Sequence, residues 1–469
     1  MGSSQSSDSG GPDVHFTDEE KDNISQMFTK ISHGNKTISK EQLQFHTGPV
    51  LGQELSLSMF CLMELSGKRH QPGGGVDLLQ FLQCLSSLLR GSVTERSTAL
   101  LHLATRGKSE ATPQQLIKCV TMLIYSFARI AEKHDEYKSW VLHRCEESYS
   151  QLALCLLEDL FHTGPAKDIG MGVPVVPDNT TFDQSQIEDC ISKSQLFLQM
   201  FEQIFSGCFH VLSKDEEVAH HLTPRVPVAG CINWAKVKSI LDFPSLIFLN
   251  SVLPPDKQME WRFLYSNLLF GDSFTQLVQK ITKQGPTVVI IRDKDGHVFG
   301  GYASQDWDFN PKFAGDAQCE LFSLKPHYGV YTTTGYNDHY MYFNNHVQTL
   351  PSGLGMGGQF DYFGLWIDHT FNNGHSKVGP RCTTYGSPQL SGKPDFEVDV
   401  IEVWAVGPEK KTDDEDITDE SRKKKSILDK DPEAQAMLTL IGKGPVSEGL
   451  REEDDTAGNP EHSKVVSLF

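Results

Sequence analysis

The chain has 469 residues, of which 38% are hydrophobic and 22% charged, an ordinary balance for a globular protein. This length has room for two or three domains. The formal net charge of −19 argues against a nucleic-acid-binding protein, because such a protein presents a basic face. No apolar run approaches the roughly 18 residues of a membrane span, so we expect none.

Cysteine usage indicates a reducing compartment. The ten cysteines lie between Cys61 and Cys382 without a Cys-x-x-Cys pair or a Cys/His metal-ligand spacing. No secretory signal precedes them, so we expect reduced, mostly buried thiols in the cytoplasm.

The first residues fit the N-myristoylation pattern, with Gly2 exposed by removal of Met1 and Ser6 at the sixth position. The alternative is a Ser/Gly-rich disordered start over residues 1–15. One myristoyl chain gives only weak, reversible membrane affinity, and no basic cluster or nearby cysteine adds a second anchor. Peripheral membrane contact would therefore need a protein partner on the membrane.

Residues 16–163 read as a helical region. Thr17 and Glu20 form a predicted capping box, and the Thr-Pro-Gln-Gln sequence at 112–115 predicts a second helix start. Residues 78–89 predict another apolar helix. The order helix–loop–helix occurs twice, as in paired EF-hands.

The two loops of this region, near residues 32–39 and 68–77, do not have the composition of calcium sites. Calcium needs several Asp, Asn or Glu oxygens and a closing bidentate Glu, and the second loop carries Lys68 and Arg69 instead. We therefore expect a degenerate, structural EF-hand-like module without a metal.

The chain changes character twice more before its tail. Residues 164–242 read as a Gly/Pro-rich linker and a helical connector. From residue 243 an apolar helical stretch is followed by short β runs, and residues 287–291 and 297–302 flank an Asp-Lys-Asp-Gly turn, a strong hairpin signal. Further strands are expected at 321–324, 330–332, 340–343, 363–367 and from 396, which together predict a β-sandwich.

The glycine-dense segment 352–368 contains Gly355, Gly357, Gly358 and Gly364 and ends in an aromatic run. We interpret it as a structural loop running into a strand. A phosphate cradle is less consistent with the sequence, because the Lys-Ser/Thr ending of a P-loop is missing and the order is loop to strand.

The tail, residues 408–469, is charged and poor in aromatic residues, as in a flexible linker. One helix is predicted within it, over 426–442, with Asp431-Pro432 at its start. Its apolar face consists of Ala434, Met437, Leu438 and Ile441. A short amphipathic helix on a tether suits docking to a partner, and packing back onto its own domain is the alternative.

Several motifs in a fixed order resemble the TLDc domain of the oxidation-resistance and nuclear-coactivator family. They are residues 271–274, 293–301, 335–338, 352–368, 382–385 and 401–407. The resemblance covers about 243–407. Together with Gly2, the helical first half and the tail segment 426–438, it narrows to the mTOR-associated branch of that family.

The resemblance implies an α+β fold: an all-α, EF-hand-like N-terminal region, a TLDc sandwich of two antiparallel sheets with flanking helices, and a C-terminal amphipathic helix. The residues that match the TLDc motifs are expected to be structural. They are Gly300, Gly301, Gly335, Asn337, Asp338, Gly355, Gly357, Gly358, Gly364, Trp366, Asp368, Cys382, Glu402 and Trp404. Met356 departs from the pattern, since it interrupts a glycine run that many TLDc domains keep unbroken.

The resemblance also implies a non-enzymatic regulatory adaptor without cofactors, peripheral on the lysosomal membrane. Its implied partners are mTOR signalling components and the vacuolar-type proton pump, bound through the TLDc domain and the C-terminal helix. The alternative is a TLDc-based, thiol-dependent enzyme that protects against oxidants, which would need an accessible cysteine of low pKa.

The residues that an enzyme would need are better explained as structural. Asp338 and Asp368 each precede a histidine, but neighbours on a strand point to opposite faces, so neither pair is expected to form a dyad. For the same reason Arg381 is expected to point away from Cys382, which we interpret as a buried structural thiol. Asn337 and Asp338 are typical turn formers.

Overall fold

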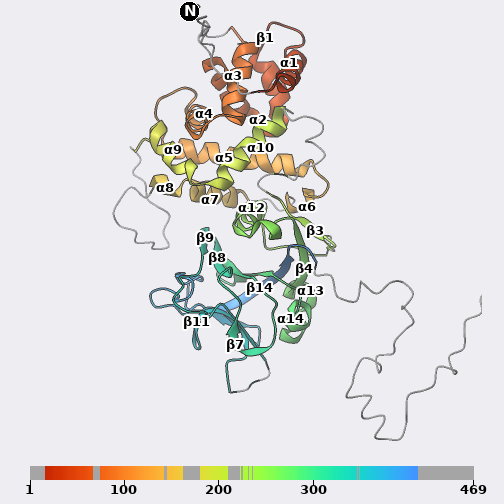
Figure 1. Cartoon of the computed structure of the whole chain (residues 1–469), viewed down its shortest axis with the longest axis vertical. Helices are drawn as coiled ribbons and strands as arrows, with labels where there is room; N and C mark the ends of the chain where they lie inside the picture. The colour runs from red at the N-terminus through yellow and green to blue at the C-terminus, as the bar shows by residue number, and fades with distance from the viewer. Residues whose placement is uncertain are drawn as a thin grey trace, which may run out of the picture. The chain divides into compact units, whose positions relative to one another are not determined.

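The computed structural model describes residues 16–66, 74–141, 145–161, 180–209, 222, 225–230, 232–234, 236–345, 347 and 349–409. Gly2 and the expected tail helix 426–442 lie outside these residues. The described chain is α+β, with helices first and a large, mainly antiparallel β structure after them (Figure 1), which confirms the predicted fold class.

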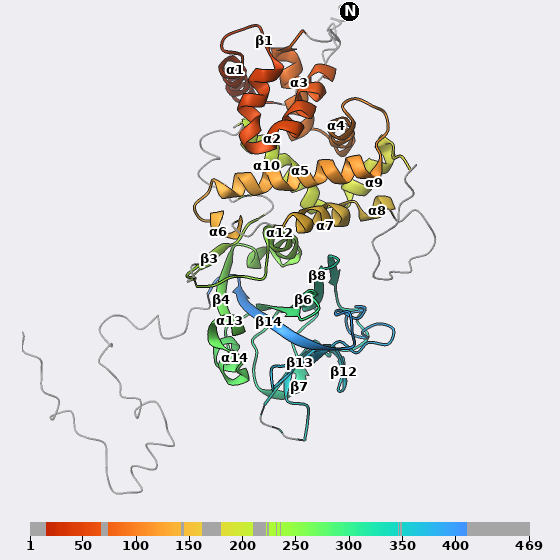
Figure 2. The same cartoon turned by 180° about the vertical axis from the view of Figure 1, so that it is seen from behind.

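The N-terminal helices mostly begin at capping boxes, including the two predicted from sequence. Thr17 pairs with Glu20 at the start of α1, and Thr112 pairs with Gln115 at the start of α5. Figure 2 shows α5 as one long helix. The helices are α1 (Asp18–Ser32), α2 (Lys40–Leu65), α3 (Leu78–Leu89), α4 (Val93–Thr105), α5 (Pro113–Glu132), α6 (Lys138–Val141), α7 (Glu146–Leu156), α8 (Glu158–Phe161), α9 (Gln184–Ser192) and α10 (Gln195–Phe209).

Two helix–loop–helix units are joined through their loops. Strand β1 (Thr37–Ile38) pairs antiparallel with β2 (Val76–Asp77). Helix α2 is kinked at Gly52, whose φ is 76°. Its first half therefore belongs to the first helix–loop–helix unit, and its second half belongs to the second unit. Arg129 of α5 donates a hydrogen bond to the Val50 carbonyl at this kink, at 2.9 Å. The two units are thus joined by the β1–β2 pair, and α5 is hydrogen-bonded to the bend of α2.

The β region is a path of hydrogen-bonded strands in the order β7-β10-β11-β12-β13-β14-β5-β6-β8-β9, with β4 paired to β14 and β3 parallel to β4. The strands are β3 (Val228–Gly230), β4 (Glu260–Ser266), β5 (Thr287–Asp293), β6 (Val298–Ala303), β7 (Asn310–Ala314), β8 (Glu320–Lys325), β9 (Gly329–Tyr331), β10 (Met341–Asn344), β11 (Gly353–Gln359), β12 (Tyr362–Asp368), β13 (Asn373–His375) and β14 (Asp395–Val406). The accompanying helical elements are α12 (Phe243–Val252), η1 (Pro255–Lys257), α13 (Asn267–Phe270) and α14 (Phe274–Ile281).

Strand β14 belongs to both layers of a sandwich. Its first residues pair with β13, and its remainder pairs with β5 on one edge and β4 on the other. The alternation of apolar and polar residues that begins at Phe396 ends at Ile401 in the sequence, which predicts a bulge or burial on both faces. The register of β14 shifts between Val398 and Val400, and burial on both faces begins at Val400. Apolar side chains of the two layers share one core, including Val289 and Leu321 from one and Leu354 and Leu365 from the other.

The prediction of a loop at the start of segment 352–368 was wrong. Residues Gly353–Gln359 form β11, which pairs with β10 and with β12. Leu354 and Met356 point into the core, while large aromatic rings of β12 lie over the glycines, so packing outweighs the poor strand propensity of glycine. Strands β4, β7 and β13 were also not predicted.

The outer face of the layer that contains β5, β6 and β8 is covered within the same folded unit. Val288, Ile290 and Phe322 of this face belong to one continuous apolar core with α12 and the N-terminal helices. Asp242, which caps α12, accepts a hydrogen bond from Ser148 of α7 at 2.5 Å and pairs with Lys325 of β8 at 3.0 Å. The helical region and this layer are thus packed together rather than linked by a bare tether.

Candidate interaction surface

Three of the motif segments meet at one place in the β-sandwich. We call residues 334–340, 357–362 and 381–386 the loop platform. The hydroxyl of Thr384 joins them, because it donates to Asn337 Oδ1 at 2.6 Å and accepts from the Gly358 amide at 2.9 Å. Asn337 Nδ2 also donates to Thr383 Oγ1 at 3.1 Å. Asn337 therefore connects two turns, a more specific role than the turn former expected from sequence.

A histidine strengthens the same junction. The His339 ring nitrogen Nδ1 lies 2.5 Å from the Gly358 carbonyl oxygen, and the ring stacks on Phe313 at 4.2 Å between centroids. The His339 carbonyl accepts from the Gly357 amide at 3.0 Å. In the turn itself Gly335 has a φ of 76°, and the Asp338 carbonyl accepts from the Tyr340 amide at 2.9 Å. Asp338 thus acts through its backbone in a turn.

The platform presents two aromatic side chains to solvent. Tyr336 is 80% exposed and Tyr362 is 61% exposed, and both follow residues of positive φ, Gly335 and Asp361. Tyr336 precedes the cross-linked Asn337, and Tyr362 is the first residue of β12 and pairs with Gln359 of β11, so both exposed rings project from hydrogen-bonded segments. Exposed aromatic side chains on a rigid support are typical of protein-binding hot spots. Sequence reasoning did not select either tyrosine.

Cys382 lies beneath this surface as a packing group. It is 4% exposed, and a β-carbon added at Gly357 or at Gly364 would stand 2.8 Å from its sulfur. This agrees with the prediction of a buried structural thiol. The structure places Cys382 in a turn, however, so the argument from strand alternation against Arg381 was wrong, although Arg381 is exposed.

The remaining motif glycines are required by close packing inside the sandwich. A β-carbon at Gly300 would overlap the Val289 carbonyl oxygen, and one at Gly301 would meet the Met356 sulfur at 2.4 Å. Met356, fully buried, thus fills the space over Gly301, which gives this departure from the family pattern a packing role. Gly355 likewise lies against the ring of Phe363, 2.7 Å from the position of an added β-carbon.

Glu402 is a fully buried carboxylate with three donors. It accepts from Ser239 Oγ at 2.5 Å, the Ile240 amide at 2.9 Å and Trp404 Nε1 at 2.5 Å. Burial raises the pKa of Glu402, and these hydrogen bonds oppose that rise. The carboxylate therefore fastens the segment before α12 to the last strand.

Trp404 is the centre of an aromatic cluster drawn from distant parts of the sequence. Its ring centroid lies 5.0 Å from that of Trp140 on α6, 5.2 Å from Phe263 and 6.1 Å from Trp261. Trp140 Nε1 donates to the Pro227 carbonyl at 2.9 Å. Through these contacts Glu402 and Trp404 tie the sandwich to the helical region.

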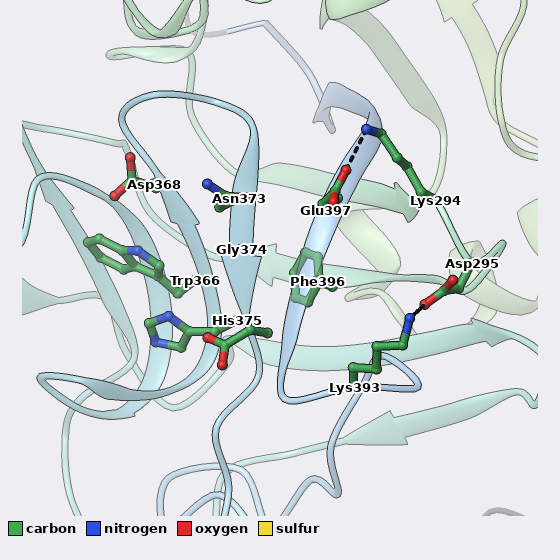
Figure 3. A pocket seen from close by; sticks show the side chains of 11 residues that line it. Lys294, Asp295, Trp366, Asp368, Asn373, Gly374, His375, Lys393, Phe396 and Glu397 are labelled. Carbon is green, nitrogen blue, oxygen red and sulfur yellow. Dashed lines mark hydrogen bonds and ion pairs between the residues drawn. The ribbon is translucent and has the colours of Figure 1, made fainter.

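Trp366 and Asp368 line an open groove of about 590 Å³ between β12, β13, β14 and the β5–β6 turn (Figure 3). Two ion pairs border it, Lys294 with Glu397 at 2.5 Å and Lys393 with Asp295 at 2.8 Å. These charges neutralise one another across the strand and the turn, so the groove carries no concentrated charge of either sign.

His375 of β13 is the perturbed group in this groove. Its ring lies against Trp366, with centroids 5.9 Å apart. Burial, with a smaller contribution from Lys377, lowers the pKa of His375 to about 4, so the ring is neutral near pH 7. Sequence reasoning did not select His375, because a single histidine within a Gly/Asn-rich segment gives no periodic signal.

The expectation that Asp368 and His369 would not meet was wrong. Asp368 Oδ1 lies 3.2 Å from His369 Nδ1, because β12 ends at Asp368 and the alternation of a strand no longer applies. The pair is open to solvent, with side-chain exposures of 36% and 51%. The residues that line the adjoining groove include no Ser, Thr or Cys nucleophile. The two side chains therefore form a solvent-exposed surface contact.

The described residues contain neither a metal-binding cluster nor a membrane-spanning helix. No group of three His, Cys, Asp or Glu side chains in them could hold a metal ion. None of the helices described is both long and apolar enough to cross a membrane.

The chain is similar to several known proteins. The family model of the TLDc domain matches residues 235–407. The chain is 37% identical over 463 residues to MTOR-associated protein MEAK7 of Gallus gallus, covering 94% of this chain and 96% of that protein. It is 37% identical over 455 residues to the Homo sapiens protein of the same name, with the same coverage. Nuclear receptor coactivator 7 of Homo sapiens is 31% identical over 202 residues, 43% of this chain and 19% of that protein.

Proposed function

Because this chain belongs to the family of mTOR-associated proteins with a TLDc domain, we propose that it is a non-enzymatic regulatory adaptor in mTOR signalling. The association with mTOR is taken from the relatives, which are named as mTOR-associated proteins. The proposal further specifies the partner protein, the membrane at which it is bound and the surfaces of this chain that make the contacts.

In the proposal, the protein binds the vacuolar-type proton pump on the cytoplasmic side of the lysosomal membrane. The TLDc domain is the main binding surface, the tail helix 426–442 is a second contact through Ala434, Met437, Leu438 and Ile441, and a myristoyl group on Gly2 tethers the chain. Each contact is weak alone, and linking them raises the apparent affinity through effective concentration.

The observation that carries the proposal is the loop platform. Its turns are cross-linked by side-chain hydrogen bonds through Asn337 and Thr384, and it exposes Tyr336 and Tyr362. A pre-ordered surface loses little conformational entropy on binding. Tyr336 is 80% exposed, and its ring is available to a partner without rearrangement of the turn that carries it.

The thiol-enzyme alternative receives little support from the described cysteines. Burial raises the pKa of Cys61 and Cys319, of Cys190 to about 11, and of Cys84, Cys119, Cys155 and Cys208 to about 12. A thiol that reacts with peroxides needs the opposite shift, because the thiolate is the nucleophile.

The decisive experiment titrates the purified full-length chain against detergent-solubilised vacuolar proton pump, with calcium and with chelator in parallel. We expect saturable binding in both conditions. Tyr336→Ala should weaken binding by about tenfold or more, the range of a hot-spot residue. Phe45→Ala is the matched control, since Phe45 is 84% exposed but lies on α2 in the helical region.

Two results would count against the proposal. No saturable binding in either condition would remove the pump as the partner and turn attention to mTOR complexes. Equal losses for Tyr336→Ala and Phe45→Ala would show that the platform is not the contact, even if the pump is bound.

A further inference from the structure

Two polar atoms on the same face of the first layer are buried without a hydrogen-bond partner among the described residues. Tyr302 of β6 and Glu320 of β8 are register partners, and their side chains are 0% and 7% exposed. The atoms are Tyr302 Oη and Glu320 Oε1. Register partners on antiparallel strands project from the same face with β-carbons about 5 Å apart. The two groups are therefore neighbours in a dry environment.

The charges around this pair are mostly acidic. The titratable and charged groups near the pair are Asp256 of η1 with its ion-pair partner Lys257, Asp316 and Cys319 of the turn before β8, and Tyr385 of the loop platform. Tyr331 of β9 is the register partner of Leu321 and therefore lies on the other face of the sheet. Lys257 is already paired with Asp256, at 2.7 Å. An ionised Glu320 would thus add a buried negative charge among acids, without a cation of its own.

The Glu320 carboxyl group therefore stays protonated up to a higher pH than an exposed glutamate does. Burial raises the pKa of Glu320 to about 7, and burial also raises the pKa of Tyr302 above its usual value. The folded protein therefore holds Glu320 in its neutral form below about pH 7, where an exposed glutamate would be ionised.

The position of the pair gives its ionisation a structural consequence. Strand β9 is the last strand in the sheet order and is hydrogen-bonded to β8. After β9 ends at Tyr331, the chain continues directly into the turn that contains Asn337. Edge strands open at lower free energy than central ones. Loosening of β8 would reach the first turn of the loop platform through this short connection.

We propose that Glu320, opposite Tyr302 in the sheet, is a pH-sensitive latch: while its carboxyl is protonated β8 stays closed on β6, and loss of the proton to solvent opens the β8–β9 edge. This inference concerns the fold and does not depend on which partner the platform binds.

The direction of the effect follows from linkage. The unfolded or open chain releases the Glu320 proton near pH 4.5, whereas the closed form releases it near 7. Closure is therefore fully stabilised below pH 4.5, loses stability as pH rises towards 7, and stays at the lower level above it.

The test is hydrogen exchange of the full-length protein at pH 5 and pH 8, comparing wild type with Glu320→Gln at each pH so that the intrinsic pH dependence of exchange cancels. The β8 and β9 amides are the readout, and the β11 and β12 amides are the internal reference. We expect the wild-type to variant ratio of opening to rise at least about tenfold from pH 5 to pH 8. Tyr302→Phe keeps the carboxyl and should keep the pH dependence.

A ratio that is equal at the two pH values would overturn the latch, because a purely structural role of Glu320 gives the same change at both. If Glu320→Gln does not fold, wild-type exchange in β8–β9 relative to β11–β12 decides instead. A relative rise from pH 5 to pH 8 supports the latch, and a constant ratio contradicts it.

Discussion

The indole ring of Trp140, on the short helix α6, packs against that of Trp404, on the last strand β14, with centroids 5.0 Å apart. The contact joins the helical region to the TLDc domain within a single core that also contains Trp261. The TLDc domain of this chain is therefore completed by residues outside the range that its family model matches.

Trp140→Ala should destabilise the whole described unit, by about 3–5 kcal/mol for the loss of a buried aromatic ring. The Pro227 carbonyl would also lose its hydrogen bond from the indole nitrogen. Denaturant unfolding of the full-length protein measures the effect, with the exposed Phe45→Ala as the control that should stay within about 0.5 kcal/mol. A change for Trp140→Ala no larger than that of the control would show that the contact is not energetically important.

Gly364→Ala should destabilise the sandwich by about 1–3 kcal/mol, because the added β-carbon would press on the Cys382 sulfur from 2.8 Å. The cost should be smaller in a Cys382→Ala background, which a double-mutant cycle measures. Gly379→Ala is the matched control, since an added β-carbon there meets nothing within 4 Å. Equal costs in the two backgrounds would contradict the role assigned to Cys382.

Stability should fall as pH drops from about 6.5 towards 4, in part through His375. Its folded pKa is lowered to about 4, so its neutral form stabilises the native state above pH 6.5, and this contribution is lost as pH falls through 4. Thermal unfolding over this range should show a shallower pH dependence for His375→Gln than for wild type. The exposed His369→Gln is the control, and an unchanged slope for His375→Gln would refute the assignment.

Deletion of residues 426–441 should weaken binding to the proton pump without changing the thermal melt of the described unit. The expected helix there is a tethered contact, so its loss removes linkage rather than core packing. A deletion of the same length at residues 452–467 controls for shortening the tail. Unchanged affinity in a quantitative titration would leave the segment without a docking role.

Gly2→Ala should move the protein from membrane to soluble fractions, because the acylated atom is the α-amino group of Gly2. Ser3→Ala keeps that glycine and should not change the distribution. Incorporation of a myristate analogue, followed in parallel, tests the chemistry directly. Incorporation into Gly2→Ala, or an unaltered distribution of that variant, would contradict lipid tethering.

Features with a local cause were predictable from sequence. The capping boxes at Thr17 and Thr112, the helix at 78–89 and the hairpin around Gly296 each depend on residues close in the chain, and each is present. The break in alternation at Ile401 likewise predicted the burial of β14 on both faces. In these cases local preference and the final fold agree.

Features with a distant cause were not predictable. Strand β11 has almost no local strand propensity and exists because Phe363 and Trp366 cover its glycines. The contact of Asp368 with His369 depends on where β12 ends, which sequence places poorly. The platform brings Asn337, Gly358 and Thr384 together through tertiary folding alone, and the sequence marked these segments only as motifs in order.

The last strand also has a mechanical meaning. The tail leaves the domain just after β14, which is hydrogen-bonded along both edges and shared by both layers. A pull on the tail would load these hydrogen bonds together and in shear, because antiparallel hydrogen bonds lie perpendicular to the strand. A force applied through the tail would therefore act on a strand that is hydrogen-bonded to β4, β5 and β13. It would not separate the sheet one hydrogen bond at a time from an edge strand.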